Sequence, residues 1–438
     1  MRLFTAALFV QFCFLLHVRE NVATPTFPSA FSSRVEMGIK DFLYGILGTN
    51  ERVQARRQAA KRLQKIQTEL NNVPFPCSDP SKYRSAKKPT SVHQLMPGDI
   101  DVIAALGDSL TAGFGASAST QLQVPIENRG LVWSIGGDGS WRSVLTLPNI
   151  LRQFNPELVG FSTGDGPAHA YSAGFNVAEG GATSDDLAFM AKVLVKRIKS
   201  HPKVNFQEDW KLVTLLIGNN DICLEMCYSE QPQEMAARFK KNLINALDYL
   251  RDNMPRTLVN FVALGRIDLL LMQMKLPLSC YAPHRIFCPC LFGPRYDRSK
   301  NLYSDIVHAM TNVSLEVAND GRYDGLDNFA VVSQPFTTRL IFPTRINNFG
   351  HNMTDISLLS PDCFHLSQSG YARAANALWN NMLEPVGEKS MDWADVLTKF
   401  NCPSESWPYI YTRINTNSVR LKRSGENTSM KINEKNNY

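Results

Sequence analysis

The sequence predicts an α/β fold of three layers, with a mostly parallel sheet between two layers of helices. Short apolar runs alternate along the chain with longer amphipathic segments, which is the pattern of strands joined by crossover helices. The apolar runs are nearly continuous rather than alternating with polar residues, which is typical of parallel strands covered on both faces. Functional groups in such sheets gather at the carboxyl ends of the strands.

The expected elements follow one another between residues 99 and 382. The first strand is expected over 101–106 and stops at Gly107, and the second covers 211–217 and stops at Gly218. The other elements continue the alternation: further strands are expected over 257–264 and 328–332, and helices over 185–199, 233–251, 298–318 and 369–382.

The first 23 residues have the features of a secretory signal peptide. Arg2 precedes an apolar run over 3–18, and the small-residue site at 21–23 follows it. The run is too short for a membrane span, no second run of about twenty apolar residues follows, and the C-terminus is polar. We therefore expect cleavage near Ala23 and a secreted, extracellular protein without an anchor.

The rest of the chain divides into three parts. Residues 24–95 are expected to form an N-terminal extension with a helix over 50–70, either packed on the main domain or acting as a propeptide. Residues 96–394 contain all the alternating elements and are expected to be one domain. Residues 395–438 are expected to be a C-terminal tail that is partly disordered, because the composition becomes polar.

The cysteines also indicate an oxidising compartment. Of the nine, Cys13 lies in the signal peptide, and the even number that remains predicts up to four disulfides with 105 arithmetically allowed pairings. Metal binding by 288–290 or by 223–227 is the alternative, but no paired CxxC units are present. We expect no metal and no cofactor. The remaining cysteines are Cys77, Cys223, Cys227, Cys280, Cys288, Cys290, Cys363 and Cys402.

Surface features suggest how the chain meets its surroundings. Glycosylation sequons occur at Asn312, Asn352 and Asn427. The net charge is +6, with much of the basic excess in 52–65 and 413–435, which suits either contact with anionic lipid or simple solvation. We expect no nucleic-acid partner, and the oligomeric state stays open.

Two serines compete as nucleophile. Gly160-Phe-Ser162-Thr-Gly164 fits the G-x-S-x-G elbow, but that elbow requires a helix directly after the turn, and residues 165–169 are rich in helix breakers. Ser109 instead lies in Gly-Asp-Ser-Leu at the end of the first expected strand. The context favours Ser109.

A serine nucleophile needs an imidazole base, a carboxylate that orients the base and donors for the oxyanion. Asp362 and His365 are spaced so that the carboxylate can meet one ring nitrogen while the other faces the serine. The oxyanion donors expected are the N–H of Ser109, the N–H of Gly181 in a glycine loop, and the side-chain amide of Asn220 in Gly-Asn-Asn-Asp.

These residues resemble the four blocks of the SGNH/GDSL hydrolases, in order: Gly-Asp-Ser-Leu at 107–110, Gly181, Gly-x-Asn-Asp at 218–221 and Asp-x-x-His at 362–365. The stretches RGLVWSIGGDGSW and TLPNILRQFNP, at 129–141 and 146–156, are similar to the phospholipase B1-like subfamily.

The resemblance implies a flavodoxin-like three-layer fold and a metal-free serine mechanism. It also implies hydrolysis of acyl esters of phospholipids and lysophospholipids, with transient contact with a membrane or micelle surface. The triad acid is Asp362 by analogy with SGNH hydrolases in general and Asp221 by analogy with the phospholipase B type. Local geometry favours Asp362, and Asp221 stays a rival.

Two other functions remain open: an extracellular esterase acting on acetylated sugars or small esters, and a secreted lipid-binding protein without activity. The stretch 264–292 bears on substrate, because it combines LLLMQMKLPL with three cysteines. It is expected either to form a disulfide-pinned apolar wall or lid for acyl chains, or to be plain core.

Overall fold

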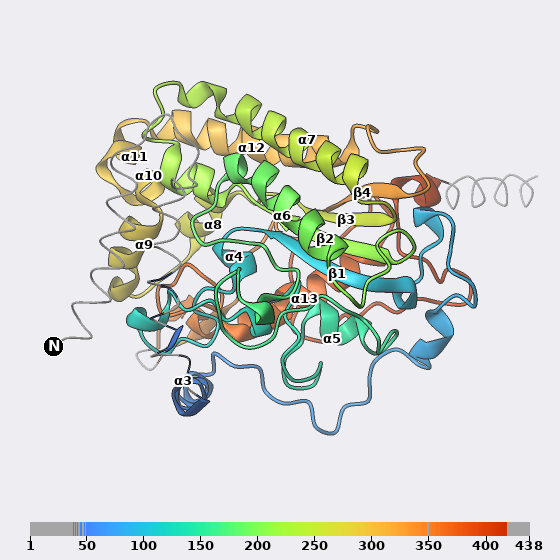
Figure 1. Cartoon of the computed structure of the whole chain (residues 1–438). Helices are drawn as coiled ribbons and strands as arrows, with labels where there is room; N and C mark the ends of the chain where they lie inside the picture. Colours follow the sequence, from blue (N-terminus) through green and yellow to red (C-terminus); the bar gives the residue numbers. More distant parts are fainter. Residues whose placement is uncertain are drawn as a thin grey trace, which may run out of the picture.

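A parallel sheet of four strands lies between two layers of helices (Figure 1). The computed structural model describes residues 38, 40, 42, 44, 45, 48, 50–347 and 350–417. The strand order follows the chain, and all three neighbouring pairs are parallel. The strands are β1 (Ile100–Gly107), β2 (Trp210–Leu216), β3 (Thr257–Val262) and β4 (Phe329–Gln334). The predicted three-layer α/β/α class is confirmed.

The edge beside β1 is not bare. Val159 and Asn176 form isolated parallel bridges with Val102 and Ala105 of β1. An irregular segment between them therefore takes the position of a further strand on the side of β1 away from β2. The sequence did not predict it, because its pairing is interrupted by glycine-rich turns and gives no regular apolar period.

Helices cover the two faces of the sheet, and each face has its own core. Val102, Ala104 and Leu106 of β1 belong to a core shared with α6 (Leu187–Lys199), α7 (Met235–Asn253) and α12 (Lys300–Asn319). Ile103 and Ala105 belong to the opposite core, with α5 (Leu147–Leu151) and α13 (Gln368–Met382). This split follows from the strand geometry, which sends successive side chains to opposite faces.

The remaining elements are short and mostly lie at the carboxyl end of the sheet (Figure 1). Apart from α3, which precedes β1, they lie in segments that follow the strands. They are α3 (Asn50–Arg62), α4 (Ser109–Ala112), α8 (Ile267–Gln273), α9 (Tyr281–Phe287), α10 (Pro289–Phe292), α11 (Pro294–Arg298), and the hairpin strands β5 (Thr344–Ile346) and β6 (Asn352–Thr354).

All eight cysteines outside the predicted signal peptide form disulfides. The first pair joins the N-terminal extension to the segment that follows the main domain, and the other three hold the region that carries α9 and α10. The pairs are Cys77–Cys402, Cys223–Cys288, Cys227–Cys290 and Cys280–Cys363. The close spacings that raised the alternative of a metal site therefore belong to two parallel bridges between the same two segments.

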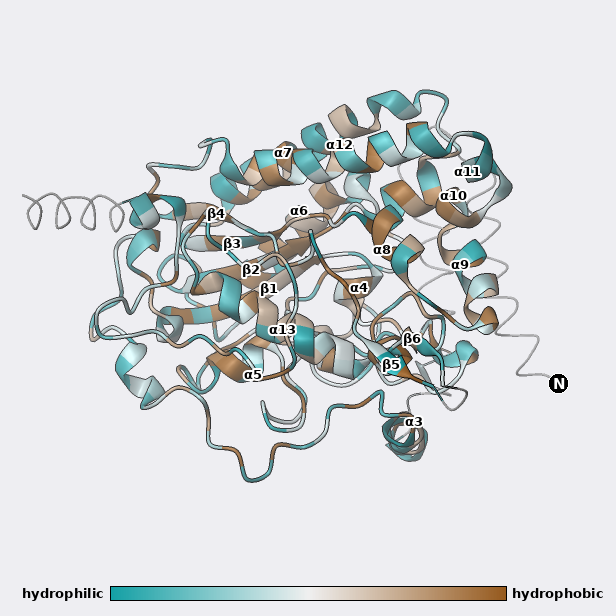
Figure 2. Ribbon diagram, turned by 180° about the vertical axis from the view of Figure 1, so that it is seen from behind, coloured by the Kyte–Doolittle hydropathy of each residue, from teal (hydrophilic) through white to brown (hydrophobic). Residues whose placement is uncertain are grey.

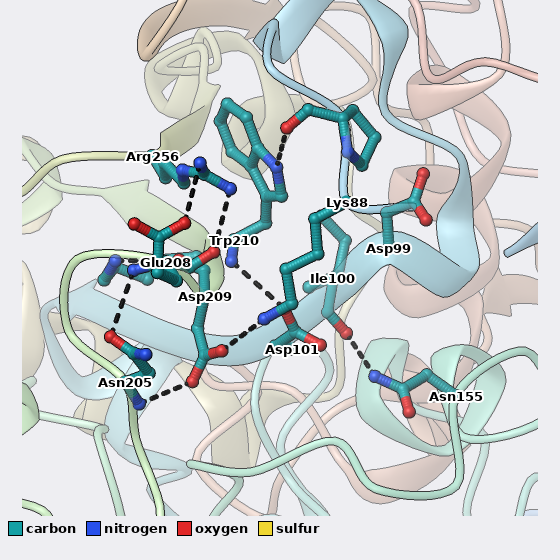
Figure 3. A network of polar contacts seen from close by, with 12 residues as sticks. Lys88, Asp99, Ile100, Asp101, Asn155, Asn205, Glu208, Asp209, Trp210 and Arg256 are labelled. Atoms are coloured by element: carbon teal, nitrogen blue, oxygen red, sulfur yellow. Dashed lines mark hydrogen bonds and ion pairs between the residues drawn. The ribbon is translucent and has the colours of Figure 1, made fainter. Parts of the chain in front are cut away.

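Charged side chains at the amino end of the sheet form a surface network (Figure 3). Lys88 pairs with Asp101 at 2.9 Å and with Asp209 at 2.5 Å, and so ties the starts of β1 and β2 together. The side chain of Asn155 donates to the carbonyl of Ile100 at 2.7 Å. These contacts fix the register of the sheet at the amino ends of its strands, away from the carboxyl ends.

The N-terminal extension packs against the main domain, but its helix is shorter than expected. α3 ends at Arg62, whereas the sequence predicted a helix over 50–70. Beyond Arg62 the buried Lys65 Nζ donates to the carbonyl of Leu359 at 2.5 Å, and the backbone N–H of Gln67 donates to Gln368 at 2.6 Å. These contacts with a distant part of the chain outweigh local helix propensity.

The last described segment also packs on the domain. Beyond the Cys77–Cys402 bridge, Ile410 is buried and its N–H donates to the carbonyl of Leu95 at 2.8 Å. Residues 395–417 of the expected tail are thus part of the folded body, and 418–438 lie outside the described residues, as does the expected signal peptide.

The sequons and the membrane-span search complete the surface description. Asn312 and Asn352 are exposed, and Asn427 lies outside the described residues. Over the part of the chain that the structure describes, no helix is long and apolar enough to cross a membrane.

Candidate active site

Ser109 lies at the carboxyl end of β1, at the first position of α4. The carboxylate of Asp108 caps this short helix by accepting from the N–H of Leu110 at 2.9 Å. Gly107 is required just before the turn, because a Cβ there would lie 2.5 Å from the carbonyl oxygen of Leu216 on β2. The strand thus passes into the helix without a loop, and Ser109 is held at the edge of the sheet with 7% of its surface exposed.

His365 connects Ser109 to Asp362. Its Nε2 lies 2.8 Å from the Ser109 Oγ, and its Nδ1 lies 2.5 Å from a carboxylate oxygen of Asp362. All three side chains are buried. Residues 256 positions apart in the sequence therefore form one hydrogen-bonded chain from hydroxyl to imidazole to carboxylate.

The loop that carries Asp362 and His365 is shaped by the Asp362 side chain itself. The second carboxylate oxygen accepts from the backbone N–H groups of Phe364 and His365, each at 3.1 Å. Burial alone would raise the pKa of Asp362, but the adjacent His365 and these donors outweigh burial and hold the pKa below its ordinary value. An ionised Asp362 suits the orientation of a ring N–H.

Asp221 is also buried at this end of the sheet, but it has a different partner. Its two carboxylate oxygens accept from the backbone N–H of Ser184 at 2.9 Å and from the Ser184 hydroxyl at 2.5 Å. Within the described part of the chain it makes no hydrogen bond to His365. Burial raises the pKa of Asp221 to about 6, although the Ser184 donors oppose that rise. Asp221 joins the turn after β2 to the loop before α6.

The three expected oxyanion donors lie on loops that are bonded to one another. The side-chain amide of Asn220 donates to the carbonyl of Ala182 at 2.8 Å, and the N–H of Glu179 donates to the carbonyl of Gly107 at 3.2 Å. Among the described residues, the backbone N–H groups of Ser109 and Gly181 have no hydrogen-bond acceptor. An amide nitrogen has two hydrogens, so Asn220 also retains a donor.

Ser162, the rival serine, lies elsewhere. Its side chain is fully buried, and its hydroxyl donates to the carbonyl of Ala173 at 2.7 Å. Its backbone N–H donates to Ile135. The Gly-x-Ser-x-Gly match is thus part of the irregular segment at the sheet edge, and among the described residues no histidine bonds to the Ser162 hydroxyl.

Two interactions that position the site were not predicted. The side-chain amide of Asn219 donates to Asp108 at 3.1 Å, which joins the turn after β2 to the turn that carries Ser109. Burial raises the pKa of Asp108. The signal for the cap was present, because Asp directly before a helix start is a common N-cap, but its second contact depends on how β1 and β2 pair.

The second unpredicted interaction is a buried ion pair between Arg129 and Glu127 at 2.6 Å. The Arg129 guanidinium also donates to the carbonyls of Gly166 and Ala178, each at 2.8 Å. It therefore holds the segment that leads into the glycine loop at Gly181. The carbonyl acceptors of Arg129 have no local sequence signal, since they come from residues dozens of positions away.

Aromatic rings enclose His365. The rings of Phe114, Phe287 and Phe364 have centroids 5.6, 5.4 and 5.3 Å from that of the imidazole. Phe287 belongs to α9, which the Cys280–Cys363 disulfide ties to the histidine loop. The stretch 264–292 thus combines both expectations, since part of it is core and part forms a wall beside the site.

The arrangement has the parts needed for nucleophilic acyl transfer. The Ser109 hydroxyl contacts the His365 imidazole, and the imidazole contacts the buried Asp362 carboxylate. N–H groups without a hydrogen-bond acceptor among the described residues lie on adjacent loops. The surrounding rings exclude water from the imidazole, which strengthens its polar contacts.

Comparisons with known proteins identify the family of this chain. Residues 103–378 match the model of the GDSL-like lipase/acylhydrolase family. The membrane-associated phospholipase B1 of Rattus norvegicus is 41% identical over 363 residues, which is 81% of this chain and 24% of that protein. The Homo sapiens phospholipase B1 is 38% identical over 374 residues, with the same shares. The chain thus spans about a quarter of the length of these relatives.

Among solved structures, an extracellular lipase from Streptomyces rimosus shares 18% identity and covers 62% of this chain and 94% of its own, with a TM-score of 0.28. With this TM-score, the likeness supports no conclusion about the fold, which is established by the sheet order. The resemblance inferred from the four sequence blocks is confirmed by the family match and by the phospholipase B1 relatives. The chain belongs to the GDSL-like lipase/acylhydrolase family.

Proposed function

We propose that this protein hydrolyses acyl esters of phospholipids and lysophospholipids through an acyl-enzyme on Ser109. The hydrogen-bonded chain Ser109–His365–Asp362 carries the proposal of a serine hydrolase. The phospholipid substrate class rests on the relatives named phospholipase B1. Four disulfides in a single domain suit an oxidising compartment, which supports secretion.

In the first half-reaction, the Ser109 Oγ attacks the acyl carbonyl carbon while its proton passes to Nε2 of His365. The negative charge on the carbonyl oxygen is stabilised by the N–H groups of Ser109 and Gly181 and by the amide of Asn220. Asp362 stabilises the imidazolium and holds its Nδ1–H. His365 then protonates the leaving alkoxide, and the acyl group remains on Ser109.

In the second half-reaction, His365 takes a proton from water, and the hydroxide attacks the acyl carbon. Collapse of the second tetrahedral intermediate breaks the bond to Oγ, and the proton returns from His365 to Ser109. The products are a free fatty acid and the regenerated hydroxyl. Asp221 takes no part in these proton transfers and acts through the Ser184 contact that joins the two oxyanion loops.

Substitution of the nucleophile tests the proposal. Ser109→Ala should lower turnover of lysophosphatidylcholine by on the order of 10⁶ while the protein stays folded. Ser162→Ala is the matched control, because it removes a buried hydroxyl outside the site and should leave turnover within a few-fold of wild type. Retained activity in the Ser109 variant would refute the mechanism. Hydrolysis of acetyl esters with no action on lysophosphatidylcholine would refute the substrate class.

A further inference from the structure

The segment between β3 and α12 supplies none of the residues of the hydrogen-bonded chain Ser109–His365–Asp362. It contains α8 to α11, which lie at the same end of the sheet as α4, the helix that begins with Ser109 (Figure 1). Figure 2 shows much of α8 as hydrophobic, although Leu269 and Met272 of this helix are exposed.

Several large apolar side chains of this segment are exposed. Leu278 is 87% exposed and Met272 54% exposed. On α8 the exposed pair is spaced i, i+3, which places it on one side of the helix, while the intervening positions face the core. We call the set the apolar face: Leu269, Met272, Leu278, Tyr281 and Ile286. Single exposed apolar residues are ordinary, but a concentration within eighteen residues marks an interaction surface.

The charged side chains within the stretch that holds the apolar face are all basic. From residue 269 to residue 296 the chain contains no Asp or Glu. Lys275 and Arg285 are exposed within this stretch, and neither has an ion-pair partner among the described residues. On α9, Arg285 lies one turn from Tyr281 on the exposed side. Exposed apolar groups interspersed with unpaired cations are the pattern of a helix that lies in an anionic lipid interface.

The opposite side of α9 contacts the catalytic loop. His284 is buried and its Nε2 lies 2.9 Å from the carbonyl of Cys363, and the Phe287 ring meets the His365 ring edge-on at 5.4 Å. The Cys280–Cys363 disulfide joins the start of the helix to the same loop. One short helix, about 10 Å in diameter, thus separates the outer apolar side chains from the imidazole.

We propose that the apolar face, with Lys275 and Arg285, is the surface through which the protein docks on aggregated lipid with anionic headgroups. The inference rests on the proposed phospholipid hydrolysis and names where the substrate surface is met. Docking there places the lipid beside the loop of His365. An acyl ester then has to move out of the lipid by only about one helix diameter to reach the site.

Binding is tested on vesicles without hydrolysis. Full-length protein carrying Ser109→Ala is floated with vesicles of phosphatidylcholine alone or of phosphatidylcholine mixed with phosphatidylglycerol. Adding Leu278→Ser and Tyr281→Ser should weaken binding to both vesicle types by about tenfold. Adding Lys275→Glu and Arg285→Glu instead should weaken binding by about tenfold or more on the anionic vesicles only, and added salt should reduce that difference.

Matched controls lie away from this end of the sheet. Val73→Ser removes an exposed apolar side chain of the extension, and Lys203→Glu reverses an exposed cation that follows α6. Both should bind vesicles as the Ser109→Ala parent does. In an active background, all six substitutions should leave turnover of soluble p-nitrophenyl butyrate unchanged, because none touches the reacting groups.

The outcomes separate the two proposals. Equal vesicle binding by the apolar-face variants and the controls overturns the docking surface, as does loss of a dimer in sedimentation when Leu278 and Tyr281 are replaced. If wild-type protein cleaves neither p-nitrophenyl butyrate nor dissolved short-chain phosphatidylcholine, the proposed function fails, whatever the vesicles show.

Discussion

The carboxylates at the carboxyl end of the parallel sheet are buried, whereas the ion pairs that Lys88 forms at its amino end are partly exposed, although Lys211 is buried there among backbone carbonyls. At the amino end, Lys88 is 43% exposed and pairs with carboxylates that also meet water (Figure 3). At the carboxyl end, Asp108, Asp221 and Asp362 are all but fully buried. Each of these three is held by hydrogen-bond donors rather than by a lysine or arginine.

The difference shows what each end does. Exposed pairs at the amino end fix the strand starts at little desolvation cost and can be replaced one at a time. Buried carboxylates at the carboxyl end cost free energy unless each is fully bonded, so the donors that surround them also fix their direction. These buried carboxylates lie at the same end of the sheet as the proposed chemistry.

The largest expected effect separates two of these buried carboxylates. Asp362→Asn should lower kcat by on the order of 10⁴, because the wrong ring nitrogen of His365 would then be protonated. Asp221→Asn should lower kcat by on the order of 10² or less, through misplaced oxyanion loops. Turnover of a soluble ester measures both, with circular dichroism to verify the fold. Equal losses would return Asp221 to the position of triad acid.

A second test compares neighbouring arginines of α3. Arg56 is buried and pairs with the buried Asp165, whereas Arg57 is partly exposed and pairs with Asp138 at 2.6 Å. Arg56→Met should lower the free energy of unfolding by about 3–5 kcal/mol, since it leaves a buried carboxylate without its cation. Arg57→Met should cost about 1 kcal/mol or less. Urea unfolding measures both losses. A loss for Arg56→Met as small as that for Arg57→Met would mean that the extension is not an integral part of the fold.

The pH dependence of the free energy of unfolding should reveal the raised pKa of Asp221. Its folded pKa of about 6 lies above the ordinary 3.8, so the folded state binds more protons between these values. Stability therefore falls as the pH rises through this window, by on the order of 2–3 kcal/mol, and the full cost is present above pH 6. Burial likewise raises the pKa of the neighbouring Glu225, to about 7.

Asp221→Asn removes this titration. In urea unfolding across the same pH window, the variant should gain stability relative to wild type as the pH rises. A constant difference between the two proteins across the window would show that Asp221 is ionised throughout, and would contradict the raised pKa.

The smallest effect is expected at the amino end. Lys88→Met should change the free energy of unfolding by about 1 kcal/mol or less, because Asp101 keeps a second partner in Arg84 at 3.1 Å. Turnover should not change. A loss of activity in this variant, measured on the same soluble ester, would contradict the conclusion that contacts at the amino end do not affect the site at the carboxyl end.

Much of the fold was predictable because its signals are local. The apolar runs that end at Gly107 and Gly218 placed β1 and β2 to within a residue or two. The spacing of Asp362 and His365 indicated that the two side chains could meet, since three residues of chain already hold them close. Strand context also separated Ser109 from Ser162, whose hydroxyl is buried against Ala173.

Other features depend on contacts that no local pattern encodes. The helix predicted over 50–70 ends early because Lys65 and Gln67 bond to residues some three hundred positions away. The edge segment beside β1 pairs through single bridges at Val159 and Asn176 and therefore shows no strand periodicity.

The sequence alone determined the sheet, the order of its strands along the chain and the residue types of a serine hydrolase. These follow from hydrophobic period and short-range spacing, which act within a few residues. Only the tertiary structure decided which carboxylate meets His365, how the eight cysteines pair and that α9 lies against the loop of His365. Those choices depend on which distant surfaces pack together, and packing is settled by the whole core rather than by any one segment.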